Sequence, residues 1–124
     1  MPISHIQTLN WQSGSDVAQG QVTYTGDGET RVNETLTNSI SNRPIAVVLT
    51  LSLLQSVYMK SDYDVFIKAV PYNNVIALKA GKPLVWGVNN YLTCPFLSNV
   101  SELQYTNTCG TMSPFVGNFL YQQP

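Results

Sequence analysis

Charge is what this sequence has least of. Lys, Arg, Asp and Glu make up 10% of its 124 residues, whereas a typical soluble protein has about 25%. The six basic residues are scattered along the chain at Arg31, Arg43, Lys60, Lys68, Lys79 and Lys82. A protein that binds a nucleic-acid backbone needs a stripe of basic side chains, so no DNA- or RNA-binding function is expected.

Ser, Thr, Asn and Gln stand in place of the missing charges, as in residues 35–42. These side chains cost less to desolvate than Lys or Glu, and the centres of protein interfaces are depleted in charge for that reason. The composition therefore suits a permanently assembled protein. A stable β protein that is merely neutral would have the same composition, so this alternative stays open.

Histidine is almost absent as well, because His5 is the only one. A Ser-His-Asp or Cys-His catalytic device would have to use this residue. Two cysteines and one histidine also leave no zinc-ligand spacing. Asp62 and Asp64, with Glu102, are candidates for a Ca²⁺ site or a glycosidase pair, but a turn is the simpler interpretation of the two aspartates. We therefore predict no enzymatic activity, no metal and no cofactor.

No apolar run approaches the ~20 residues that cross a bilayer. Residues 1–6 lack the basic and apolar regions of a signal peptide, so we expect a protein that is made in a cytosol and does not enter membranes.

Cys94 and Cys109 are the only cysteines. A disulfide between them would close a loop of about 15 residues and contribute about 3 kcal/mol. Synthesis in a reducing compartment favours two buried thiols instead, and both alternatives remain open.

Turn-forming residues recur at short intervals, with β-type runs between them. This rhythm is typical of a sandwich or a barrel. We predict a single all-β domain over residues 1–124, an antiparallel β-sandwich or jelly-roll-like fold of about nine or ten short strands. The predicted strands span residues 4–11, 18–24, 29–36, 45–58, 64–70, 75–78, 84–86, 102–106 and 116–121.

Two of these strands have a predicted place in the sheet. Residues 45–58 form the most apolar run and follow Pro44. One period-2 face of this run carries Val47, Leu49, Leu51 and Leu53. That alternation, together with the β-branched content, predicts a central strand rather than a helix. Residues 29–36 are polar at most positions, which indicates an edge or solvent-facing strand.

Aromatic residues are the remaining candidates for a binding surface. Tyr and Trp dominate the energetics of protein interfaces, and the interface candidates here are Tyr58, Tyr63, Tyr72 and Tyr91. The alternative is a sugar platform, in which exposed rings stack on a sugar beside amide donors. Its residues would be Trp86, Asn89, Asn90 and Tyr91. Burial in the core is the simplest interpretation of aromatics in a sandwich.

Four segments in the middle of the sequence follow a fixed layout. Residues 54–62 read Leu-Gln-Ser-Val-Tyr-Met-Lys-Ser-Asp, and residues 65–68 read Val-Phe-Ile-Lys. Residues 76–86 read Ile-Ala-Leu-Lys-Ala-Gly-Lys-Pro-Leu-Val-Trp, and residues 99–107 read Asn-Val-Ser-Glu-Leu-Gln-Tyr-Thr-Asn. Over about residues 50–107 this layout resembles small virion proteins of tailed bacteriophages, of the head-decoration or cement type. Asn99 stands where those proteins have an aspartate.

The resemblance implies a non-enzymatic structural protein of the virion, folded as a β-sandwich or jelly roll. Such a protein binds the capsid surface and its own copies, so the expected partners are the major capsid protein or another virion protein. A homo-oligomer is expected, with a trimer slightly favoured. The protein would be assembled in the host cytoplasm and located in the virion. The alternative function is a carbohydrate-binding module of a phage receptor-binding or cell-wall-binding protein.

Overall fold

The computed structural model describes residues 3–71, 74–88 and 93–122. Strands make up most of this part of the chain, and their pairings are antiparallel. The strands are β1 (Ile3–Ser13), β2 (Asp16–Gly26), β3 (Gly28–Leu36), β4 (Ile40–Ile45), β5 (Leu54–Ser61), β6 (Val65–Val70), β7 (Asn74–Leu78), β8 (Leu84–Gly87), β9 (Glu102–Asn107) and β10 (Ser113–Tyr121). Among the described residues no helix is long and apolar enough to cross a membrane.

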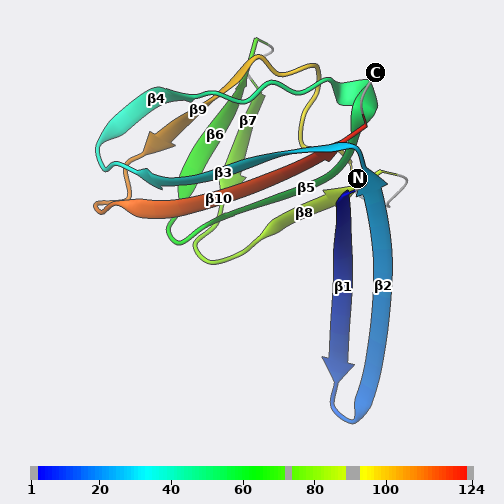
Figure 1. Ribbon diagram of the computed structural model, residues 1–124. Coiled ribbons are helices and arrows are strands. Elements are labelled where there is room, and N and C mark those ends of the chain that lie inside the picture. Colours follow the sequence, from blue (N-terminus) through cyan, green and yellow to red (C-terminus); the bar gives the residue numbers. More distant parts are fainter. Residues whose placement is uncertain (1–2, 72–73, 89–92, 123–124) are drawn as a thin grey trace.

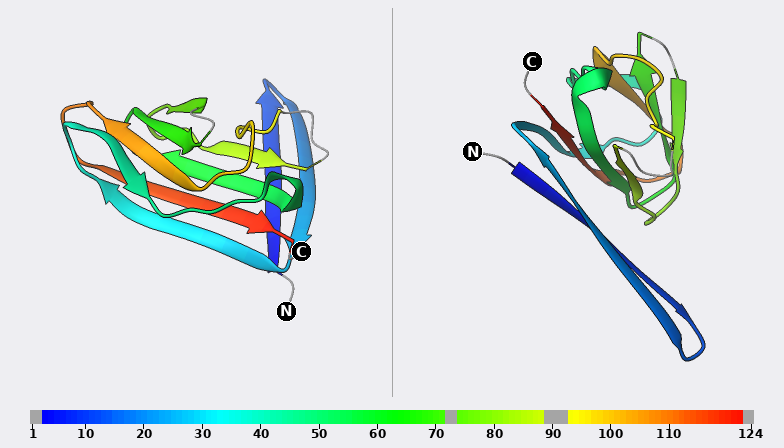
Figure 2. Two further views of the ribbon diagram at one scale, coloured as in Figure 1. Left: turned by 90° about the horizontal axis from the view of Figure 1, so that it is seen from above. Right: turned by 90° about the vertical axis from the view of Figure 1, so that its right-hand side faces the viewer.

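Eight of the strands form two four-stranded sheets that lie face to face (Figures 1 and 2). The first sheet has the order β3-β10-β5-β8 and the second the order β4-β9-β6-β7. Most connections between consecutive strands cross from one sheet to the other. Two four-stranded antiparallel sheets connected in this way make a jelly roll. The prediction of an all-β sandwich of the jelly-roll type is confirmed, and β3 is an edge strand of the first sheet as expected.

The core lies between the two sheets. Phe115, Phe119 and Met59 enter it from the first sheet, and Ile67 and Leu103 enter it from the second. All five side chains are fully buried. Burial alternates residue by residue along β9 and the first part of β10, which is the period-2 pattern of strands with one face on a core.

The prediction of one strand over residues 45–58 is wrong. The chain leaves β4 at Ile45, makes a single bridge between Leu49 and Val100, and turns through a short 3-10 helix, η1 (Leu51–Leu53), before β5 begins. The Asn99 side chain causes part of this break, because its Oδ1 accepts the Leu51 N–H at 2.8 Å. Of the predicted core face, Val47 and Leu49 are buried, whereas Leu51 and Leu53 are only partly buried.

Strand β4 was not predicted, because Asn42, Arg43 and Pro44 read as a loop. Its pairing with β9 is irregular, with a register shift between Ile40 and Arg43, and Asn42 has a positive φ of 55°. Strand β4 is at the edge of the second sheet, and an edge is where a sheet tolerates proline. A bulged edge strand of this kind lacks the alternation that identifies strands in a sequence.

Strands β1 and β2 form a sheet of their own. They pair along their whole length, from Ile3 opposite Gly26 to Ser13 opposite Asp16. The hairpin loop is tight, and Gly14 adopts a positive φ of 59° in it, as such loops require. Figures 1 and 2 show the hairpin projecting well beyond the sandwich. We call residues 3–26 the arm.

Candidate functional site

The two faces of the arm differ in composition. Because paired residues share a face in an antiparallel ribbon, the register defines each face. One face carries Ile3, His5, Gln7, Leu9, Trp11 and Ser13 from β1, with Gly26, Tyr24, Val22, Gly20, Ala18 and Asp16 opposite them. The other face carries mostly Ser, Thr, Asn and Gln, with Ile6 and Val17 as the exceptions. We call the first face the inner face, because its first part lies against the sandwich.

Exposure changes abruptly along the inner face. Ile3, His5 and Gln7 are partly buried, and Tyr24 is buried. From residue 8 to residue 23, every residue whose exposure the structure describes is exposed. We therefore divide the arm into an anchored half, residues 3–7 with 22–26, and an overhanging half, residues 8–21.

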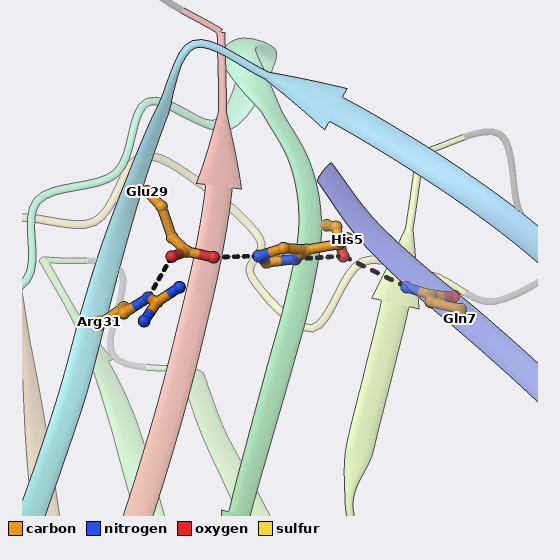
Figure 3. A network of polar contacts seen from close by, with 5 residues as sticks. His5, Gln7, Glu29 and Arg31 are labelled. Carbon is orange, nitrogen blue, oxygen red and sulfur yellow. Dashed lines mark hydrogen bonds and ion pairs between the residues drawn. The ribbon is translucent and has the colours of Figure 1, made fainter. Parts of the chain in front are cut away.

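A chain of hydrogen bonds attaches the anchored half to the outer surface of the first sheet (Figure 3). His5 Nδ1 lies 3.0 Å from Ser56 Oγ on β5. The Gln7 amide donates to the Trp86 carbonyl on β8 at 2.9 Å and to Ser56 Oγ at 3.3 Å. These bonds place the arm across β5 and β8, since Ser56 and Trp86 lie on those two strands.

Glu29, at the start of β3, extends the same network. Its carboxylate pairs with His5 Nε2 through one oxygen and with Arg31 Nε through the other. Burial alone would raise the pKa of Glu29, but hydrogen bonds from His5 and Arg31 outweigh burial and leave the pKa below its usual value. The carboxylate is therefore ionised near neutral pH and fixes the orientation of the imidazole.

Backbone contacts hold the base of the arm. The Asp27 N–H donates to the Tyr121 carbonyl at 3.0 Å, and the Gln122 amide donates to the Thr25 carbonyl at 3.1 Å. The Tyr24 ring packs directly on β8, where a Cβ at Gly87 would lie 2.1 Å from Tyr24 Cζ. Only glycine leaves room for this ring, so the sequence of β8 is matched to the arm.

Ser56, His5 and Glu29 are the residue types of a hydrolase triad, but their geometry is that of an anchor. A nucleophilic serine has to reach a substrate carbonyl. The residue Ser56 is 1% exposed, and its hydroxyl lies between His5 and the Gln7 amide that donates to it. In this position the hydroxyl completes a satisfied chain of hydrogen bonds, which locks the arm on the sheet.

The overhanging half continues past the edge of the sandwich. Strand β8 is the last strand of its sheet, and Figure 3 shows β1 passing over β8 and running on beyond it. On the inner face of the overhanging half, Leu9 is 68% exposed and Trp11 is 56% exposed. Val22 of the anchored half, next to them on the same face, is 50% exposed. Large apolar side chains gathered on one exposed face mark an interaction surface.

A groove runs between the arm and the outer surface of the first sheet. Its volume is about 560 Å³. The arm contributes residues 3–8 to its lining, including the anchor residues His5 and Gln7, and the sheet side contributes Ser56, Tyr58, Pro83, Val85 and Asn118. The charged groups at its end, Glu29 and Arg31, are paired with each other. We call it the arm groove.

The predicted interface residues are only partly accounted for. Tyr58 is half-buried and lines the arm groove. Tyr63 is exposed in the turn after β5, away from the residues that hold the arm. Tyr72 and Tyr91 lie outside the described residues.

The sugar platform is not supported where it can be followed. Trp86 is 9% exposed and belongs to the core, so its ring is not available for stacking on a sugar. Asn89, Asn90 and Tyr91 lie outside the described residues. The exposed tryptophan is Trp11 on the arm, which the aromatic pattern alone did not distinguish from a core residue.

The cysteines and acidic residues have local roles. Cys94 and Cys109 are both free, so the disulfide alternative is wrong, and Cys109 is exposed rather than buried. Burial raises the pKa of the Cys94 thiol. Asp64 accepts the Ala80 N–H at 2.7 Å, which is a turn contact. Within the described residues no three His, Cys, Asp or Glu side chains come together as metal ligands would.

Sequence reasoning missed the anchor. His5 reads as an ordinary polar residue of a first strand, and Gln7, Glu29 and Ser56 read as surface or strand positions. Their meeting depends on where the arm crosses the sheet, over sequence separations of 24 to 51 residues. The only local signal is the alternation of residues 3–11, which predicts the strand but not its partner.

Comparisons of the chain with protein-family models, with curated proteins and with solved structures found no significant match. No relative therefore assigns a role to the arm or to the arm groove.

Proposed function

We propose that this chain is a non-enzymatic assembly subunit of a bacteriophage virion, a capsid decoration or cement protein. It binds the major capsid protein or another virion protein and its own copies, and forms a closed homo-oligomer, with a trimer slightly favoured. The observation that carries the proposal is the overhanging half of the arm, which carries Leu9 and Trp11, both exposed, together on one face. Exposed apolar side chains gathered on one face are typical of protein–protein interaction surfaces.

Fold, composition and resemblance support this function from three directions. Jelly rolls are common in viral capsid proteins and in lectins, although a fold alone assigns no function. The charged fraction of 10% suits surfaces that become desolvated in an assembly. The assignment to a phage rests on the resemblance of residues 50–107 to small virion proteins. The segment contains β5 to β9, so it belongs to the sandwich and not to the arm.

The carbohydrate-binding alternative has less support. It needs exposed rings beside amide donors, and the tryptophan on which it was based is buried. A glycan array separates the two functions. The proposal predicts no selective binding to any sugar, and saturable binding to one class of glycan would favour the alternative.

The direct test is to find the protein in particles of the phage that encodes it. Mass spectrometry of purified virions, with copies counted against the major capsid protein, should detect many copies per particle. Absence from the particles would end the proposal. A variant in which residues 8–21 are replaced by Asn-Gly keeps the anchored half and closes it with a two-residue loop. This variant should fold and should decorate particles with fewer copies than the full chain.

A further inference from the structure

We infer that the overhanging half of the arm docks on a second copy of this chain, in that copy's arm groove, so that neighbouring copies exchange arms. The inference rests on the proposed assembly function and names the partner that the arm binds first.

The anchored half shows that the inner face of the arm fits the outer surface of the first sheet. His5 and Gln7 bond to β5 and β8, and Tyr24 packs on Gly87. The overhanging half keeps the same alternation but carries apolar side chains, Leu9 and Trp11 on β1. The same sheet surface has an apolar part that these side chains fit, formed by Tyr58, Pro83 and Val85.

The arm groove offers a second site for such a ribbon on the same sheet surface. The apolar part of its sheet side is formed by Tyr58, Val85 and Pro83, and its arm side by residues 3–8 of the resident arm. An incoming arm would lie beside the resident arm. In a closed assembly every copy gives one arm and receives one, so no docking surface is left unused.

The charges match this occupant. Residues 3–26 contain no Lys or Arg and a single acidic residue. The charged pair at the end of the arm groove, Glu29 with Arg31, is already neutralised internally. The single charge of this ribbon is Asp16, which adjoins the hairpin loop. Such a ribbon brings at most one charge into the groove, whereas a more highly charged partner surface would have a larger desolvation penalty.

The area fits a weak, reversible contact. Six residue pairs of ribbon are about 20 Å long and about 10 Å wide, so one docked arm covers roughly 200 Å² and as much of the receiving surface. Two exchanged arms then bury roughly 800 Å², which is below the roughly 1,200–2,000 Å² of standard interfaces and in the range of weak, transient ones. A two-stranded hairpin by itself is only marginally stable in water, so docking also gives the overhanging half the support that it lacks in one copy.

Light scattering on the isolated protein at micromolar concentration tests the inference. The full chain should be a dimer or a trimer, and the chain in which residues 8–21 are replaced by Asn-Gly should be a monomer. Leu9→Gln should raise the dissociation constant of the oligomer at least roughly tenfold. The matched control is Val17→Gln, which changes an equally exposed apolar residue on the opposite face of the arm and should leave the mass unchanged.

A mixing experiment identifies the groove. Tyr58→Glu places a charge in the arm groove but leaves the arm intact, whereas the shortened-arm variant lacks the overhanging half and keeps the groove lining apart from Thr8. Each should be a monomer alone and should unfold cooperatively, which shows that it is folded. Mixed together they should form a heterodimer, because one intact arm then meets one open groove. Two folded monomers that do not combine would overturn the inference.

The outcomes separate the inference from the proposed function. A full chain that is monomeric and still binds particles would overturn arm exchange and leave the virion role standing, with the capsid as the partner of the arm. An oligomer that survives arm shortening would also overturn it. Arm-dependent oligomers that are absent from virions would contradict the virion role alone.

Discussion

The two halves of the arm are made from one pair of strands in one continuous register, yet they are in opposite environments. The anchored half has polar side chains that form specific bonds to β5 and β8, and its Tyr24 is buried. The overhanging half has apolar side chains on the same face and no neighbour among the described residues that buries them.

The two halves of the arm differ in the kind of interaction that their side chains can make. A polar anchor fixes direction, because hydrogen bonds depend on geometry. An apolar surface supplies association energy, because burial of apolar area is favourable without demanding one geometry. In the proposed assembly, the anchor would hold the overhanging half in a fixed position and so lower the entropy that is lost on binding.

The sharpest contrast is between the arm and the core. Phe119→Ala removes a fully buried ring and should lower the free energy of unfolding by about 3–5 kcal/mol. Trp11→Ala, on the overhanging half, should change it by less than about 0.5 kcal/mol in the dissociated monomer. Urea unfolding at low protein concentration measures both. A large loss for Trp11→Ala would show that the overhanging half packs on its own sandwich.

The base of the arm should be next in sensitivity. Gly87→Ala puts a methyl group into the Tyr24 ring and should cost about 1–3 kcal/mol, because Tyr24 must leave its place. Limited proteolysis within residues 3–26 should become faster while the sandwich stays folded. Gly20→Ala is the matched control, since a Cβ at Gly20 meets no atom within 4 Å, and its arm should be cut at the original rate.

The anchor should depend on pH through Glu29. Its pKa is lowered in the folded protein from a usual value of 4.5, so its contribution to anchoring is complete above that value and is lost as the pH falls through the lowered pKa. Backbone NMR signals of residues 3–7 should shift in this acidic range while those of β9 stay in place. Glu29→Gln should remove the transition. An unchanged titration in this variant would mean that another group controls the anchor.

The smallest effect concerns Leu51, which the sequence predicts on the core face of a strand and the structure places in the 3-10 helix η1. A partly buried side chain in a 3-10 turn should cost less on truncation than a core leucine, so Leu51→Ala should lower the free energy of unfolding by about 1 kcal/mol. Leu103→Ala, at a fully buried position of β9, should cost about 2–5 kcal/mol. Equal losses would place Leu51 in the core.

The strands that the sequence predicts correctly are those with period-2 alternation between clear turns, such as β6, β7 and β9. Residues 45–58 alternate just as well, but the Asn99 side chain takes a backbone N–H that a continuous strand would have used. That contact joins residues 48 positions apart, so no local pattern contains it. Strand β4 could not be predicted for a similar reason. A strand that contains a proline such as Pro44 is tolerated at a sheet edge, and only the topology shows that β4 is at an edge.

The arm illustrates the same limit for the site. Its two strands and its turn follow from local pattern, because Leu9 and Trp11 alternate with polar residues like those of any core strand. Alternation indicates an apolar face but not what packs on it. The sandwich of the same chain does not bury Leu9 and Trp11, because β8 is at the sheet edge and the arm runs on beyond it.

Hydrogen–deuterium exchange of the two halves at two protein concentrations tests the central claim most directly. The anchored half, residues 3–7 and 22–26, should be protected equally at low and high concentration, because its bonds lie within one chain. The overhanging half, residues 8–21, should exchange rapidly in the dilute monomer and become protected as the protein assembles. Protection of the overhanging half that does not change with concentration, in a protein shown to be assembled at the higher concentration, would contradict the account.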